Sequence, residues 1–364
     1  MAERIEKVVV VGAGHGGVEA AAALRQRGFD RQITLVSDEP DIPYQRPPLS
    51  KEYIKRPGNP LMLRPQQFFD DNAVTLMLGV RAVSIDRAGR TVQLSTGESL
   101  SYDHLVLATG ARNRKPPLPG LDHPAIVELR TLADANRIVG AIGGWKHVCV
   151  IGGGFIGLEA AGLLATMGIA VDVVEMAPRL MQRAVSPTIS EWFLGFHRSR
   201  GNRVHLSTVV KAVEHRSDGA TVVLDTGERI ECDAVILAAG VMPNAELAEA
   251  AGLKVENGIV VDGFLVTSDP AISAIGDCAY YPSRHLPGMV RLESVQNATD
   301  QGRAVAAWLM GEAAPYDALP WFWSIQGEAR LQIAGLSKPG LEEVLRGDPA
   351  SGKFSVFLYE GERL

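Results

Sequence analysis

The chain has 364 residues, of which 46% are hydrophobic and 21% charged, and its 36 basic and 42 acidic side chains give a net charge of −6. At about 150 residues per domain this length predicts two or three globular domains with ample core, and the negative charge argues against a general nucleic-acid binder. No apolar run approaches the roughly 18 residues that a membrane-spanning helix needs, so a membrane-spanning protein is excluded.

The first predicted element is an apolar strand, Val8–Val11, which leads into the glycine turn GAGHGG and an alanine-rich helix. A G-x-G-x-x-G turn between a strand and a helix is typical of dinucleotide-binding folds. In such a turn Gly12 permits the tight bend, Gly14 lets the backbone approach a pyrophosphate, and Gly17 allows the helix to pack closely on the strand. The helix N-terminus then offers unpaired N–H groups to the phosphates.

The next elements complete a first α/β unit. The apolar strand after the alanine-rich helix is followed by Ser37, Asp38 and Glu39, and we expect Asp38 to bind a dinucleotide ribose. Alternating runs and a Thr-Gly-Glu turn within residues 80–110 predict a β-meander and a last apolar strand that ends in glycine. The proline- and glycine-rich residues 111–121 predict a linker into a second domain.

The same unit then recurs 140 positions later. The first strand of this second copy, Val148–Ile151, leads into the turn GGGFIG. Residues 209–240 then repeat the meander, the Thr-Gly-Glu turn and the final strand. Strands that alternate with helices in this way predict parallel sheets covered on both faces. The matching positions of the first unit are Gly12, Gly14, Gly17, Glu19, Ala20, Ala21, Leu24 and Gly28, and those of the second are Gly152, Gly154, Gly157, Glu159, Ala160, Ala161, Leu164 and Gly168.

In the second copy Glu175 directly follows the apolar strand Val171–Val174. We expect its carboxylate to bind the adenosine ribose hydroxyls and to repel a 2′-phosphate, which favours NAD over NADP. Two such sites in one chain predict two dinucleotides, one resident and one exchanging, and the economical pair is FAD and NADH.

The three cysteines lie far apart in the sequence and form no C-x-x-C pair. They therefore predict neither a disulfide framework nor a redox dithiol, and they fit a reducing cytoplasm. The glycine-rich N-terminal stretch, with His15 and Glu19, does not have the composition of a secretory signal peptide.

On these motifs the chain resembles the FAD-dependent pyridine-nucleotide oxidoreductases, and within them the NADH-dependent ferredoxin reductases of the putidaredoxin reductase type. Further segments carry the resemblance: Pro43–Lys51 (PYQRPPLSK), His104–Gly110 (HLVLATG), Arg130–Thr131, Ala238–Asn244 (AAGVMPN), Thr267–Ala279 (TSDPAISAIGDCA), Glu293–Val295 and Pro320–Ser324 (PWFWS).

The resemblance implies an α/β fold with two Rossmann-like dinucleotide-binding domains, as in glutathione reductase. The NAD domain is inserted in the FAD domain, and a short α+β domain follows. The implied limits are residues 1–112 and 241–318 for FAD binding, 113–240 for NAD binding and 319–364 for the C-terminal domain.

The resemblance also implies site residues. Lys51 is expected near flavin N5, paired with Glu159, where it would stabilise the electron density that arrives with a hydride. The helix after Ser294 is expected to face the flavin and favour its reduced, anionic form, and Trp323 is expected to flank the flavin. The cofactor-binding positions are Gly12, Gly14, Gly16, Gly17, Asp38, Lys51, Ala82, Thr109, Gly110, Arg130, Asp277, Glu293 and Val295 for FAD, and Gly152, Gly154, Gly157, Glu159, Glu175 and Gly240 for NADH.

The implied activity is transfer of a hydride from NADH to a tightly but non-covalently bound FAD, followed by single-electron transfers to a [2Fe-2S] ferredoxin that serves a monooxygenase or dioxygenase. No metal site, nucleic acid or membrane is implied, and the protein is expected to be a monomer or homodimer. Because ferredoxins are usually acidic, docking predicts a local basic patch, for which Arg291, Arg303 and Arg330 are candidates.

Two departures from the family pattern leave alternatives open. Ile325 and Gly327 stand where the family usually has an acidic residue and an aromatic one, and the relatives are expected to continue for several dozen residues past Leu364. Electrons could therefore pass to rubredoxin, quinone or oxygen instead. The third interpretation is a non-enzymatic flavoprotein like apoptosis-inducing factor, in which reduction of the flavin switches binding to a partner or the oligomeric state.

Overall fold

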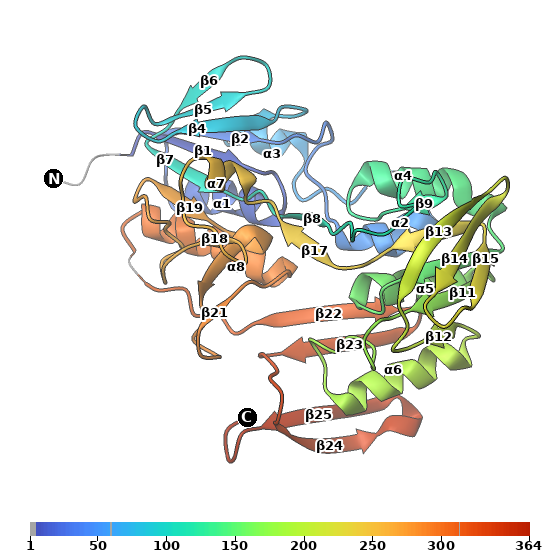
Figure 1. Ribbon diagram of the computed structural model, residues 1–364. Coiled ribbons are helices and arrows are strands. Elements are labelled where there is room, and N and C mark those ends of the chain that lie inside the picture. The colour runs from blue at the N-terminus through green and yellow to red at the C-terminus, as the bar shows by residue number, and fades with distance from the viewer. Residues whose placement is uncertain (1–4, 59, 313) are drawn as a thin grey trace. The chain divides into compact units, whose positions relative to one another are not determined.

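A computed structural model of the chain describes residues 5–58, 60–312 and 314–364 (Figure 1). Its contacts form two compact units. The first comprises Met1–Gln45, Leu61–Arg112 and Met242–Phe322, and the second Arg46–Pro60, Asn113–Val241 and Trp323–Leu364. The assignment of residue ranges to FAD-binding, NAD-binding and C-terminal domains stays a prediction.

The first unit is built on a five-stranded parallel sheet in the order β19-β7-β1-β2-β3. A separate meander, β4-β5-β6, is antiparallel. The elements of this unit are β1 (Lys7–Val11), α1 (His15–Gln26), β2 (Gln32–Val36), α3 (Gln66–Asp71), β3 (Val74–Met77), β4 (Ala82–Asp86), β5 (Thr91–Leu94), β6 (Ser99–Ser101), β7 (His104–Leu107), α7 (Glu246–Ala250), β18 (Ile259–Val260), β19 (Ile272–Ala274), the 3-10 turn η3 (Gly276–Cys278), β20 (Ala279–Pro282), β21 (Met289–Val290) and α8 (Val295–Leu309).

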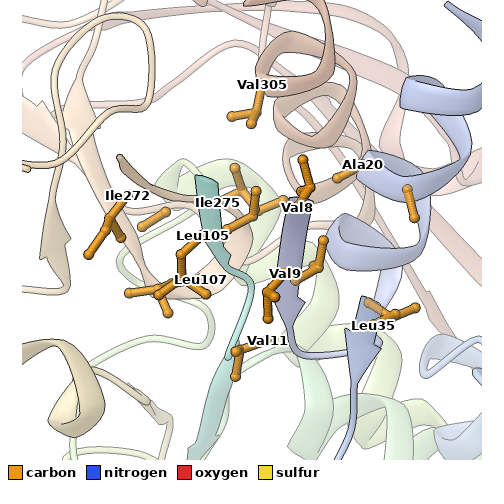
Figure 2. Packing of buried hydrophobic residues seen from close by; sticks show 14 of the residues in the cluster. Val8, Val9, Val11, Ala20, Leu35, Leu105, Leu107, Ile272, Ile275 and Val305 are labelled. Atoms are coloured by element: carbon orange, nitrogen blue, oxygen red, sulfur yellow. The ribbon is translucent and has the colours of Figure 1, made fainter. Parts of the chain in front are cut away.

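The core of this unit forms because its central strands are apolar on both faces. Val8–Val11 of β1 are buried, and Leu35, Leu105 and Ile272 extend the same layer on the neighbouring strands (Figure 2). Helices α1 and α8 lie against each other at close range, since a Cβ on Gly302 would come within 2.7 Å of the Gly16 carbonyl oxygen. This glycine pair holds the first glycine turn against α8.

The second unit repeats this plan with the parallel order β12-β11-β10-β16-β9 and the antiparallel meander β13-β14-β15. Its elements are the 3-10 turn η1 (Pro47–Ser50), α2 (Glu52–Lys55), β9 (Ile126–Val127), α4 (Leu132–Ala141), η2 (Ile142–Gly144), β10 (His147–Ile151), α5 (Phe155–Thr166), β11 (Ala170–Val174), α6 (Pro187–Ser199), β12 (Arg203–His205), β13 (Val210–Arg216), β14 (Gly219–Leu224), β15 (Arg229–Cys232), β16 (Ala234–Leu237), β23 (Ala329–Ala334), β24 (Glu342–Asp348), η4 (Pro349–Ser351) and β25 (Lys353–Tyr359).

Three strands lie where the chain passes from one unit to the other: β8 (Ala111–Asn113), β17 (Val241–Pro243) and β22 (Trp321–Gln326). The last of these forms a hairpin with β23. A second hairpin, β24–β25, contacts α6, where Trp192 donates a hydrogen bond to the Pro349 carbonyl oxygen at 2.8 Å and packs on Phe354.

The predicted parallel-sheet α/β fold is confirmed, and the repeat extends to a detail that the sequence comparison did not single out. Asp103 accepts hydrogen bonds from the backbone N–H groups of Glu6 and Lys7, both at 2.8 Å. In the second unit Asp233 accepts them from Lys146 and His147, at 2.6 and 2.8 Å. In each unit an aspartate just before the strand that follows the meander, β7 or β16, therefore anchors the start of the first strand, β1 or β10.

Candidate functional site

The two glycine turns have nearly identical geometry. Gly12 and Gly152 adopt φ values of +110° and +113°, in the region that only glycine enters freely. A Cβ on Gly12 would lie 2.1 Å from the Ala108 carbonyl oxygen, and one on Gly152 would lie 2.3 Å from that of Ala238. Both positions therefore need glycine for the fold itself.

The middle glycines have a different role. Gly14 and Gly154 are the residues before α1 and α5, and a Cβ at either would meet nothing within 4 Å. The space beside each turn is thus open to a ligand, next to the first N–H groups of a 12-residue helix. This arrangement fits a dinucleotide pyrophosphate.

The predicted ribose carboxylates lie at the ends of the second strands. Glu175 accepts hydrogen bonds from the N–H groups of Gly153, at 2.6 Å, and Ala177, at 2.7 Å, so its carboxylate is held against the glycine turn. Asp38 lies 3.4 Å from the Arg81 guanidinium, and 57% of its side chain is exposed. Glu175 is therefore the more firmly positioned of the two.

Lys51 and Glu159 come together in the second unit. Lys51 Nζ lies 2.6 Å from Glu159 Oε2, with 16% and 8% of the two side chains exposed. The ammonium group also donates to the Pro47 carbonyl oxygen and to Ser50 Oγ, each at 3.1 Å. Lys51, the last residue of the PYQRPPLSK motif, thus forms a buried ion pair with a carboxylate on α5, two residues past Gly157.

Sequence reasoning missed the other partners of Glu159. Ser50 Oγ donates to Oε2 and Ser324 Oγ donates to Oε1, both at 2.8 Å, and the Ile325 N–H lies 3.3 Å from Oε1. The PWFWS motif therefore contributes a serine to this carboxylate. A serine has no spacing signal of its own, and only the motif around it could have indicated the position.

The equivalent residue of the first unit has different partners. Glu19 is also buried, but it pairs with Arg303, at 2.7 Å, and with Arg64, at 3.5 Å. Both arginines belong to the same unit as Glu19, Arg303 on α8 and Arg64 in the loop before α3. The repeat preserves the position of the carboxylate but not the groups it binds.

The other predicted residues fall into two groups. In the first unit, Thr109 exchanges hydrogen bonds with Asn244, at 2.6 and 2.9 Å. Asp277 lies in η3, and its carbonyl oxygen accepts from Arg291 at 3.2 Å. The remaining residues of this group are Gly16 and Gly17 in α1, Ala82 at the start of β4, Gly110 after β7, Glu293, and Val295 at the start of α8.

The second group lies in the second unit with Lys51 and Glu159. The Arg130 carbonyl oxygen accepts from Arg46 at 2.8 Å, and that of Gly240 accepts from the Arg114 N–H at 2.9 Å. Gly157 allows α5 to approach β10, since a Cβ there would lie 2.1 Å from the Gly152 carbonyl oxygen. Trp323 lies in β22.

Two of the three candidate docking arginines are engaged. Arg291 is 9% exposed and pairs with Glu293 at 2.6 Å. Arg303 is 57% exposed, but its guanidinium pairs with Glu19 and Asp300. Arg330 is exposed on β23. Arg291 is thus too buried to belong to a docking surface.

All three cysteines are free and buried. Burial raises the pKa of Cys149 well above its ordinary value and raises that of Cys232 to about 11. The pKa of Cys278 is also raised by burial. Each thiol is therefore poorly nucleophilic at neutral pH.

Within residues 5–58, 60–312 and 314–364, no helix is long and apolar enough to cross a membrane. Across the same described ranges, His, Cys, Asp and Glu side chains form no group of three or more that could hold a metal ion.

Comparison with known proteins gives two family matches, to "Pyridine nucleotide-disulphide oxidoreductase" over residues 6–302 and to "Reductase C-terminal" over residues 321–364. Rhodocoxin reductase of Rhodococcus erythropolis is 48% identical over 361 residues, which cover 98% of this chain and 84% of the relative. The ferredoxin reductase for the CYP199A2 system of Rhodopseudomonas palustris is a similar solved structure, with a TM-score of 0.95, 48% identity and coverage of 98% of this chain and 88% of that one. The covalent putidaredoxin reductase–putidaredoxin complex matches with a TM-score of 0.94, 39% identity and coverage of 99% and 88%.

Proposed function

The chain belongs to the pyridine nucleotide-disulphide oxidoreductase family, and on this premise we propose that it is an FAD-containing NADH:ferredoxin reductase. It is an oxidoreductase that uses flavin and a pyridine nucleotide. The proposal adds that FAD is bound tightly without a covalent link, that NADH is the co-substrate, and that a small iron–sulfur protein, a [2Fe-2S] ferredoxin serving an oxygenase, receives the electrons.

The observation that carries the proposal is the state of the cysteines. The family name refers to disulphide reduction, but Cys149, Cys232 and Cys278 are each buried as free thiols. No pair of them is available to pass electrons to a disulfide substrate. Electrons must therefore leave directly from the flavin, which suits a one-electron protein acceptor. The free thiols also support a reducing compartment, and we place the protein in the cytoplasm.

A bound flavin would supply the redox chemistry, since it accepts electrons in a pair and releases them singly. The chain's own residues would bind the two dinucleotides and orient them. The open spaces at Gly14 and Gly154 would admit the two pyrophosphates, and Glu175 would bind the adenosine ribose of NADH. Lys51, held in place by Glu159, would stabilise negative charge that arrives with a hydride.

The test is an absorption spectrum of the isolated protein, followed while NADH is added in stoichiometric steps without oxygen. We expect a yellow protein whose flavin absorbance is bleached by one equivalent of NADH. Turnover is then compared with ferredoxin, rubredoxin, quinone and air as acceptors. A colourless protein, or faster turnover with quinone or air than with ferredoxin, contradicts the proposal. A slow reaction that leaves a long-lived charge-transfer band indicates a redox-switch flavoprotein instead.

A further inference from the structure

A continuous series of buried hydrogen bonds connects α6 with Glu159 inside the second unit. His197 on α6 and both Ser324 and Gln326 on β22 have no exposed surface. His197 Nε2 lies 2.9 Å from Gln326 Oε1, Gln326 Nε2 lies 3.3 Å from Ser324 Oγ, and Ser324 Oγ lies 2.8 Å from Glu159 Oε1. The series therefore ends on the carboxylate that pairs with Lys51.

Each bond in the series fixes the direction of the next. Asn202 Nδ2 lies 3.0 Å from His197 Nδ1, so that nitrogen accepts and the proton of the ring is on Nε2. Nε2 then donates to Gln326 Oε1, which turns the NH₂ group of Gln326 toward Ser324. Because Ser324 Oγ accepts from that NH₂ group, its own proton is directed to Glu159. Burial lowers the pKa of His197, which keeps the ring neutral and leaves Nδ1 free to accept.

Gln326 also connects the series with the second glycine turn. Its Nε2 lies 3.4 Å from Met181 Sδ, and the Met181 N–H donates to the Gly153 carbonyl oxygen at 2.9 Å. Buried polar side chains are costly unless they are satisfied. A route of satisfied groups that leads from α6 to the Lys51–Glu159 pair, with a branch to the turn, indicates a role at the site.

We propose that Gln326 and His197 are positioning residues, which act through Ser324 to fix the orientation of Glu159 and thereby the place of Lys51. This inference rests on the proposed function, in which Lys51 and Glu159 serve hydride transfer. Neither Gln326 nor His197 touches a reacting group, and their effect comes from the direction of the hydrogen bonds.

Gln326→Glu tests the direction of these hydrogen bonds, because it leaves the volume of the side chain nearly unchanged. A carboxylate at this position accepts from His197 and from Ser324, so the Ser324 proton turns away from Glu159. Gln326→Glu should therefore have the same effect as Ser324→Ala, and the double variant should add nothing further. Ser190→Ala is the matched control, because Ser190 on α6 is equally buried but donates to the Leu180 carbonyl oxygen, outside the series.

Three measurements are made on the full-length, flavin-loaded protein after thermal unfolding has established that each variant is folded. They are the single-turnover rate of flavin reduction by NADH, the NADH dissociation constant, and the rate at which an amine reagent labels Lys51. For both single variants we expect the reduction rate to fall about three- to tenfold, as for one lost hydrogen bond. NADH affinity should be unchanged and Lys51 labelling faster, because the ammonium is less firmly held.

The inference is overturned if Gln326→Glu leaves the rate and the labelling at wild-type values, if the effects of the two single variants add, or if Ser190→Ala matches them. Failure of the proposed function is a separate result, since there the wild-type flavin is not reduced by NADH. Lys51 labelling still tests the positioning role in that case.

Discussion

The glycines of each turn differ in what a side chain there would contact, and this difference separates folding from binding. At Gly152 an added Cβ meets backbone and the φ of +113° is unfavourable, whereas at Gly154 it meets nothing within 4 Å. Gly152→Ala should therefore lower the free energy of unfolding by at least about 1–3 kcal/mol from backbone strain alone. Gly154→Ala should leave stability unchanged but weaken NADH binding, as thermal unfolding and NADH titration would measure. Equal loss of stability in both variants would contradict this interpretation.

Glu175 is expected to determine coenzyme choice. Its carboxylate is held by the N–H groups of Gly153 and Ala177, where a 2′-phosphate would meet a fixed negative charge. Glu175→Gln keeps a hydrogen-bond acceptor but removes that charge. The kcat/KM ratio of NADH to NADPH should fall by at least about tenfold. An unchanged ratio would show that another residue excludes the 2′-phosphate.

At this scale the sequence predicts residues whose spacing has a physical reason. The turn glycines and Glu175 were predictable because a strand, a bend and a helix impose their positions. Ser324 and Gln326 were not, because a buried serine and a buried glutamine follow no periodicity. Their role depends on a hairpin that brings residues 324–326 to α5, more than 150 positions from Glu159.

Among the elements, three neighbouring strands of the second sheet share one buried carboxylate. Asp172 of β11 has no exposed surface, and it accepts from His147 of β10 at 2.6 Å, from His205 of β12 at 2.7 Å and from Arg203. The sequence AVDVV gives no sign of this, because the partners become neighbours only through the strand register.

This cluster predicts a pH-dependent contribution to stability. Burial alone would raise the pKa of Asp172, but the hydrogen bonds from His147, Arg203 and His205 outweigh it and lower the pKa to about 2. A depressed carboxyl pKa stabilises the fold above the ordinary pKa of 3.8, and this contribution is lost as the pH falls toward 2. Asp172→Asn should cost about 1.5–3 kcal/mol at neutral pH, the range of a hydrogen bond to a charged group.

The measurement is urea unfolding of wild type and Asp172→Asn across the acid range. The difference in unfolding free energy should shrink between about pH 4 and about pH 2. Asp218→Asn is the control, because 70% of the Asp218 side chain is exposed. A difference that stays constant down to about pH 2 would contradict the assignment.

Element boundaries were well predicted where a strand is fully buried. The apolar runs at residues 8–11, 148–151 and 171–174 are present as β1, β10 and β11, each one residue longer at its start. The helix expected after Ser294 is present as α8. The Lys51–Glu159 pair was expected from the family resemblance and is present. The serine partners of Glu159 and the arginine partners of Glu19 could not be predicted from the repeat, because they come from segments outside it.

For the whole molecule, the buried cysteines predict resistance to thiol reagents. Burial raises the pKa of all three thiols, so the thiolate form is scarce at neutral pH. A disulfide-exchange reagent should label the native flavoprotein very slowly and leave NADH oxidation unchanged. In denaturant all three thiols should react rapidly, which is the control. Fast labelling of one cysteine together with loss of activity would indicate that a thiol carries electrons.

The equivalent positions Glu19 and Glu159 show how two copies of one structural unit can differ in the groups that they bind. The same position of the helix carries a carboxylate in both units. Glu19 pairs with two arginines and Glu159 pairs with a lysine, and these partners come from segments of the chain outside the repeat. Changes confined to those segments would therefore alter the partners of the carboxylate while the repeated unit itself stayed unchanged. For engineers, the Glu19 site offers an internal reference against which any redesign of the Glu159 site can be judged.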